Sequence, residues 1–308
     1  MQWRKVKNIF CPDHHHDWMV SHAANPFAVK LKKDVFRIFF TCRNKSNQSH
    51  IGFVDVDFKN EYRILRISKQ PVLSPGEPGL FDDSGVAAGY ILPVKNKLRL
   101  YYVGWNLKVT VPWMNTIGMA TWNPKKDKFE KFSRAPVMDR SEADPFSISY
   151  PSILREKKIY RMWYGSNVSW GRKETDMHHV IKYAESKDGI HWRRSGKIII
   201  PLRGKNEYAL SKPFVRKENS VYKMWYSYRA GKKSKTYRIG YAESNDGVKW
   251  KRKDNKSGID VSTKGWDSKM ICYPFVFSYG KNKYMLYNGN SYGKTGFGLA
   301  ILEKQKTI

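Results

Sequence analysis

Short runs of aromatic and aliphatic residues recur along this chain at a constant spacing. They begin at positions 36, 98, 160, 222 and 284, which are 62 residues apart, and Tyr160-Arg161-Met162-Trp163-Tyr164 is the fullest of them. Such a run is too short for a helix and is typical of a buried β-strand. Five units of this length account for all 308 residues. We therefore expect a single domain over residues 1–308 that is built from one repeated β-unit.

Each unit carries further strand signals at fixed places around this run. Upstream lies an apolar segment, marked in four units by Pro26, Pro151, Pro213 and Pro274 and in the second unit by residues 85–91. Downstream, apolar segments begin at 51, 117, 181, 239 and 296, and Asp-Gly pairs at 188 and 246 supply hairpin turns into a fourth strand. Four antiparallel strands in each of five radially arranged units predict an all-β, five-bladed β-propeller.

The two ends of the chain complement one another. The last unit stops after its third strand, near Ile301 and Leu302, and so lacks an outer strand. Residues 3–12 repeat the spacing of residues 192–201 from tryptophan to proline, with the aliphatic positions in register. Residues 2–10 are therefore predicted to form the outer strand of blade five and to close the ring.

Composition narrows the class of protein. No window approaches the ~18 apolar residues that span a bilayer, and no apolar signal segment follows the first basic residues, so we expect a cytoplasmic protein without a transmembrane segment. The three cysteines, Cys11, Cys42 and Cys272, are odd in number and lack metal-binding spacing, which favours buried, reduced thiols. No motif indicates a cofactor.

The formal net charge of +30 is the most unusual bulk property. A field of this sign attracts phosphate, nucleic acid, anionic lipid and acidic glycans. Lys and Arg are spread over all five units, however, so a solvated basic surface also accounts for the charge. No nucleic-acid-binding motif accompanies it, and we expect no nucleic-acid partner. The oligomeric state is not predicted.

Candidate catalytic residues come from one face of the predicted propeller. The residues before the first strand of a blade and those after its second strand open there around the central channel, whereas the Asp-Gly hairpins lie on the opposite face. Acidic residues precede the first strand in every unit, and glycosidic chemistry uses such carboxylates as acid, base or nucleophile. The catalytic candidates are Asp83, Asp144, Asp17, Glu207 and Asp267. Turn capping by Asp is the alternative for any single one.

Candidate binding residues follow the second strands. Arg and Asn hydrogen-bond hydroxyls or anions, and Trp offers a flat face to a sugar ring. The candidates are Arg43, Trp105, Asn167, Arg229 and Asn290, joined by His22, His178 and His179 on the same face. The segment from Asp13 to Asp17 holds three consecutive histidines, which cannot converge on one ion in an extended chain, so no metal site is predicted.

Several of these motifs resemble those of the five-bladed propeller glycosidases, families 32, 43, 62, 68 and 130. The resemblance rests on the aromatic second strands, the Ser-x-Asp-Gly-x-x-Trp hairpins and Ala143-Asp144-Pro145. Ser21 to Pro26, Leu80 to Gly85 and Gly104-Trp105-Asn106 are more similar to propeller proteins encoded among bacterial surface-polysaccharide genes. This resemblance adds Asn25 and Asn106 to the binding candidates.

The resemblance implies an enzyme that acts on glycosidic bonds. In the family an Asp beside the proline of blade one serves as base or nucleophile, but Asn25 precedes Pro26 here. Asp17 would then take that role, or Asp83 and Asp144 would form the working pair with Glu207 or Asp267 assisting.

Three hypotheses stay open. The first is a glycan hydrolase or transferase of surface-polysaccharide metabolism, and the second is a phosphorylase in which Arg43, His22 and Arg229 hold phosphate. The third is a non-catalytic, glycan-binding propeller. In each the expected partner is a carbohydrate, with anionic and nucleotide-linked sugars included.

Overall fold

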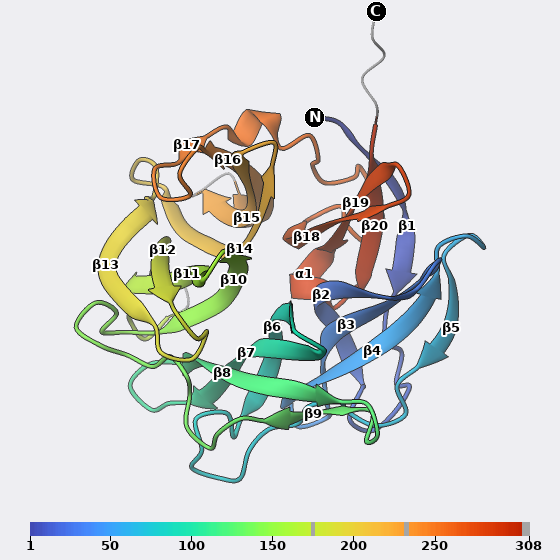
Figure 1. Cartoon of the computed structure of the whole chain (residues 1–308), viewed down its shortest axis with the longest axis horizontal. Coiled ribbons are helices and arrows are strands. Elements are labelled where there is room, and N and C mark those ends of the chain that lie inside the picture. Colours follow the sequence, from blue (N-terminus) through green and yellow to red (C-terminus); the bar gives the residue numbers. More distant parts are fainter. Residues whose placement is uncertain (174–175, 231–233, 304–308) are drawn as a thin grey trace, which may run out of the picture.

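A computed structural model describes residues 1–173, 176–230 and 234–303, and its regular secondary structure is almost entirely β-strand (Figure 1). Within these ranges the strands pair antiparallel in groups of four. The first two groups are β2 (Ser21–Lys32), β3 (Val35–Arg43), β4 (Ser49–Asp57) and β5 (Arg63–Ile67), then β6 (Gly85–Val94), β7 (Lys97–Leu107), β8 (Trp113–Asn123) and β9 (Lys128–Lys131). The next two are β10 (Ile148–Glu156), β11 (Ile159–Ser169), β12 (His178–Ser186) and β13 (Arg193–Ile200), then β14 (Glu207–Glu218), β15 (Val221–Ala230), β16 (Ser234–Ser244) and β17 (Lys251–Arg252).

The last group joins the two ends of the chain. It contains β18 (Cys272–Tyr279), β19 (Asn282–Asn288), β20 (Phe297–Leu302) and the N-terminal strand β1 (Trp3–Phe10). β1 pairs antiparallel with β20, with Trp3 opposite Leu302 and Phe10 opposite Phe297. Two short helical turns, η2 (Asp254–Lys256) and α1 (Asn290–Gly293), lie in the connections.

Single parallel bridges link neighbouring groups and make the sheets mixed. Ser49 pairs with Gly85 between β4 and β6, and His179 pairs with Ala209 between β12 and β14. The first strands of several groups also meet through their aromatic rings at the centre of the molecule. Phe275 lies 4.1 Å from Phe27 and 4.7 Å from Phe214, measured between ring centroids. The groups therefore surround a shared centre.

The recurring aromatic runs occupy the second strand of each group. Trp163, Tyr164, Trp225 and Tyr226 are all buried, although alternate residues of a strand point to opposite faces of its sheet. Both faces of these strands are thus covered by neighbouring sheets, which explains why the runs are continuously apolar.

The first strands share an irregularity beside their prolines. Pairing with the second strand skips the proline and the residue before it, and that residue has a positive φ: 54° at Asn25, 44° at Tyr150, 50° at Lys212 and 57° at Tyr273. A positive φ is uncommon outside glycine. Its recurrence at equivalent places indicates a feature of the fold, and three of these four side chains reach the cavity described next.

Candidate functional site

A cavity of about 430 Å³ opens where the first and second strands of the groups come together. Its wall is polar and aromatic. Among the residues that the structure describes, the lining is His22, Ala24, Asn25, Thr41, Arg43, Asn47, Ser49, Ala87, Val103, Trp105, Leu107, Trp113, Asn115, Ser149, Tyr150, Asn167, Trp170, Met177, His179, Ser211, Arg229, Tyr237, Tyr273 and Tyr292. This set includes two arginines and two histidines and contains neither Asp nor Glu.

Most of the predicted binding residues lie on this wall. Strand ends bring them together, because second strands finish at the cavity and first strands begin there. They are His22, Asn25, Arg43, Trp105, Asn167, His179 and Arg229. Their role in binding stays a prediction, but they share one cavity.

Three predicted binding residues do not line the cavity. Asn106 donates to the Leu80 carbonyl and to Asp83, at 2.6 and 2.7 Å. The Nδ1 atom of His178 lies 2.8 Å from the Ser169 hydroxyl, and the Asn290 side chain accepts from the backbone N–H groups of residues 269 and 270. These side chains hold loops around the cavity in place.

Sequence reasoning missed much of the aromatic wall. Tyr150, Tyr273, Trp113 and Trp170 all line the cavity. A signal for the two tyrosines was present, because each directly precedes a proline at the place that Asn25 occupies in the first unit. Trp113 begins β8 and Trp170 directly follows β11, and the repeat pattern does not define these strand boundaries.

The wall is electropositive. Arg43 donates to the Asn47 side chain at 2.6 Å, and Arg229 donates to the Tyr292 hydroxyl while its guanidinium lies 4.3 Å from the centroid of the Tyr237 ring. In the part of the chain that the structure describes, no carboxylate forms an ion pair with Arg43. The positive charge of Arg43 thus faces the cavity without a fixed counter-charge.

The two histidines of the wall are neutral near pH 7. Burial, with the charges of Arg43 and Lys294, lowers the pKa of His22 to about 4. Burial, with the charges of Arg229 and His178, lowers the pKa of His179 to about 4 as well. A neutral imidazole offers one donor and one acceptor, so both rings suit hydrogen bonding to a polar ligand.

Two buried amides of the wall have unused hydrogen-bonding atoms. Asn25 is 2% exposed and Asn167 is 4% exposed, and neither Asn25 Oδ1 nor Asn167 Nδ2 has a partner among the described residues. The backbone of Asn25 is fixed by an N–H bond to the Asn288 side chain at 2.8 Å. An unpaired buried polar atom costs about 1–3 kcal/mol. One acceptor and one donor of the wall thus lack a partner, but both atoms are covered, so a ligand would reach them only after neighbouring side chains move.

The predicted catalytic carboxylates lie elsewhere, and Asp144 shows the arrangement most clearly. It is fully buried and accepts from Tyr164 at 2.9 Å and Ser166 at 2.6 Å. It also forms ion pairs with Lys182 and Arg194, at 3.1 and 3.0 Å. These partners saturate both carboxylate oxygens.

The same arrangement recurs in other groups. Asp267 accepts from Tyr287 at 3.0 Å and pairs with Lys5 of β1 at 2.7 Å. Glu207 receives two bonds from Arg252 of β17, at 2.7 and 2.8 Å. In each case the cation comes from an outer strand, as Arg194 of β13 does for Asp144. These carboxylates tie outer strands to the entry of first strands, and none of them lines the cavity.

Asp83 and Asp144 both lie outside the cavity wall. Asp83 accepts from Asn106, the Gly79 N–H and Ser84 at 2.7 to 2.9 Å, and shares no partner with Asp144. Burial acts to raise the pKa of Asp83, but the hydrogen bonds from Asn106 and Gly79 outweigh it and lower that pKa. Asp83 thus caps the loop before β6. A working pair of Asp83 and Asp144 would require both to reach the cavity, and neither lines it.

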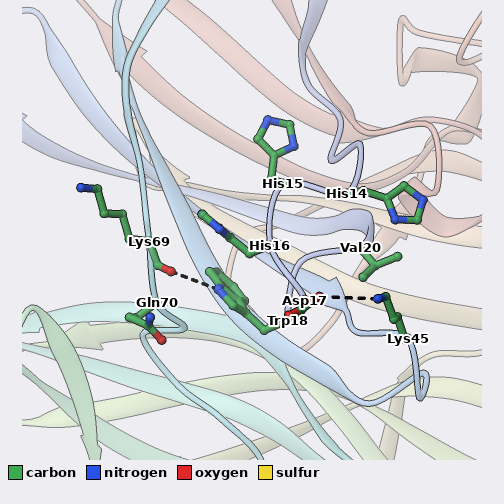
Figure 2. A pocket seen from close by; sticks show the side chains of 9 residues that line it. All are labelled: His14, His15, His16, Asp17, Trp18, Val20, Lys45, Lys69 and Gln70. Atoms are coloured by element: carbon green, nitrogen blue, oxygen red, sulfur yellow. Dashed lines mark hydrogen bonds and ion pairs between the residues drawn. The ribbon is translucent and has the colours of Figure 1, made fainter.

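Asp17 lies in a separate surface pocket of about 550 Å³ (Figure 2). Its side chain is 98% exposed and pairs with Lys45 at 3.6 Å, while Trp18 donates to the Lys69 carbonyl at 3.2 Å. His14, His15 and His16 line this pocket and point in different directions. Among the described residues, no three His, Cys, Asp or Glu side chains are placed to hold one metal ion.

Comparison with known proteins finds proteins of similar sequence and solved structures of similar fold. No family model matches the chain. The chain is 46% identical over 303 residues to the uncharacterized protein Rv1502 of Mycobacterium tuberculosis, covering 98% of this chain and 100% of that one.

Two solved structures share its architecture. A glycosyl hydrolase from Bacteroides ovatus superposes with a TM-score of 0.74 at 14% identity, covering 99% of this chain and 94% of that one. A structure from the GH130 family of mannoside phosphorylases and glycoside hydrolases gives 0.70 at 15% identity, covering 99% and 95%. These likenesses show a β-propeller fold of the glycoside hydrolase type.

No helix among the described residues is long and apolar enough to cross a membrane.

Proposed function

We propose that this chain, which belongs to the family of the Mycobacterium tuberculosis protein Rv1502, is a glycan-active protein whose central cavity binds a carbohydrate with an anionic group. One observation carries the proposal. The described wall of the cavity combines arginine, neutral histidine, amide and aromatic side chains and contains no carboxylate.

Each class of side chain matches one part of such a ligand. Arg43 and Arg229 match a carboxylate or phosphate, which guanidinium groups bind with two parallel hydrogen bonds. Trp105 and the tyrosines match the CH faces of a sugar ring. The amides of Asn25 and Asn167, which line the wall, match sugar hydroxyl groups, because an amide both donates and accepts hydrogen bonds.

The size of the cavity and the charge of the chain agree with this ligand. A volume of about 430 Å³ lies within the usual range of small-molecule sites, roughly 300–1,000 Å³, and suits a short saccharide. The net charge of +30 attracts anions toward the protein and raises their local concentration.

We also propose that the strand groups are the five blades of one propeller domain over residues 1–308, closed by residues 2–10. The pairing of β1 with β20 supports this closure. So does the bond from the Asn25 N–H in β2 to Asn288 in β19, because it ties the first group to the last.

A phosphate-dependent reaction on a glycosidic bond is the second candidate function. Arg43 and the neutral His22 stand together on one side of the cavity, where they would hold inorganic phosphate. Hydrolysis by Asp83, Asp144, Asp17, Glu207 or Asp267 has weaker support, because these side chains are hydrogen-bonded or ion-paired outside the cavity wall. A role in surface-polysaccharide metabolism rests on the sequence resemblance alone, and a cytoplasmic location remains an expectation from the sequence.

Calorimetric titration tests the proposal. Glucuronic acid, glucose 1-phosphate and a uridine diphosphate sugar should include a ligand that binds at least tenfold more tightly than glucose. Arg43→Ala should weaken that ligand by about 10- to 100-fold, since a charge-assisted bond contributes about 1.5–3 kcal/mol. Arg4→Ala is the matched control, because this arginine is 61% exposed and outside the cavity. Equal affinity for glucose and its acidic derivatives would contradict the anionic part of the proposal.

A further inference from the structure

An apolar patch stands at the rim of the cavity. Leu107, the last residue of β7, is 68% exposed, and Val109, in the connection between β7 and β8, is exposed to 103% of its reference area. On β11, Val168 is 39% exposed. Aliphatic side chains so open to water are uncommon at the tip of a hairpin, where polar residues are the rule.

Two tryptophans join this patch to the cavity. Trp113 pairs with Leu107 across β7 and β8, and its ring lies 5.9 Å from that of Trp170, which follows β11. Leu107, Trp113 and Trp170 also line the cavity. We define the rim patch as Leu107, Val109, Trp113, Val168 and Trp170.

Basic side chains flank the rim patch. Lys108 lies within the hairpin, and Arg172 and Lys173 follow Trp170, all exposed. In the described ranges none of the three forms an ion pair with a carboxylate. The rim thus combines exposed aliphatic side chains, tryptophan rings and basic side chains. Asp83 lies near Lys108, and Asp176 accepts from the Lys173 N–H, so part of this positive charge is compensated.

This combination matches the surface of an anionic membrane. Tryptophan prefers the interface between headgroups and acyl chains, aliphatic tips insert below it, and each nearby Lys or Arg adds about 1 kcal/mol of attraction to anionic lipid. A stable protein interface needs about 20–30 residues on each side, many more than this patch offers. The net charge of +30 adds a long-range attraction of the same sign.

We propose that the rim patch docks this protein on an anionic membrane surface and brings the cavity mouth to the level of the headgroups. The protein binds there peripherally, with Val109 and Val168 below the headgroups. This inference stands on the rim alone and does not depend on the ligand of the cavity.

Vesicle co-sedimentation at 0.15 M salt tests the proposal. The wild-type chain should pellet with vesicles of phosphatidylglycerol and phosphatidylcholine and remain in solution with phosphatidylcholine alone. The Val109→Asp/Val168→Asp variant should bind the anionic vesicles at least tenfold more weakly. Because both side chains are exposed and outside the cavity lining, the variant should keep the melting temperature of the wild type.

Two matched controls separate docking from general attraction. Leu65→Asp changes a 45% exposed leucine on β5, outside the patch, and should leave vesicle binding unchanged. Lys108→Gln should weaken binding without abolishing it. Equal losses in the Val109/Val168 and Leu65 variants would overturn the proposal, because charge alone would then explain binding. Binding of wild type to heparin but not to vesicles would overturn it in favour of a soluble polyanion.

Discussion

Replacing Asp144 by Asn tests whether the acidic residues before the first strands serve stability. The substitution keeps the shape of the side chain but removes its charge. Lys182 and Arg194, whose side chains are 7% and 12% exposed, then keep their charges without a counter-ion. Breaking a buried ion pair from one side costs about 3–5 kcal/mol. The bonds from Tyr164 and Ser166 must also rearrange.

The expected result is a large loss of stability without a selective loss of binding. A cost of about 3–5 kcal/mol lowers the melting temperature by about 5–8 °C in a domain of this size. Calorimetric melting and urea denaturation measure the loss. Ligand affinity at 15 °C, where the variant is folded, should stay within about threefold of wild type, because Asp144 does not line the cavity.

Asp17→Asn is the control. The Asp17 side chain is 98% exposed and its ion pair with Lys45 is 3.6 Å long, so its replacement should leave the melting temperature unchanged. If Asp144→Asn instead melts like wild type and abolishes turnover of an identified substrate, Asp144 acts in catalysis and our structural interpretation is refuted.

Three further predictions concern other parts of the molecule. Deleting residues 2–10 removes buried Trp3 and Phe10 and exposes the edge of β20, so the truncated chain should aggregate in size-exclusion chromatography; a monomer that melts normally would contradict this. Asp188→Ala removes the caps on the backbone N–H groups of residues 190 and 191, and should lower the melting temperature while ligand affinity, measured by titration, stays unchanged. Burial lowers the pKa of Lys212 from 10.5 to about 7, so the unfolded chain binds more protons between these pH values and stability should rise with pH there; Lys212→Met should flatten that rise in urea titrations, and an unchanged slope would refute the assignment.

The sequence by itself determined the repeated strands and the residues at their ends. A buried strand is a local pattern of apolar residues, so the runs from Phe36, Tyr160 and Tyr222 predict strands without reference to the rest of the chain. Because strand ends recur at a fixed distance from these runs, the sequence also placed Arg43 and Arg229 at a common face. Both predictions depend on the distance along the sequence between recurring segments, which can be read from the sequence alone.

Only the tertiary structure decided which polar side chains face the cavity. Asp144 accepts a hydrogen bond from Arg194, which lies 50 residues further along the chain. The negative charge of Asp144 is thereby neutralised within the fold. Tyr150 and Tyr273 reach the cavity because the positive φ before each proline turns the strand at that place. A local pattern identifies an Asp before a strand, but the partner that neutralises it comes from another strand, and that choice is made by packing.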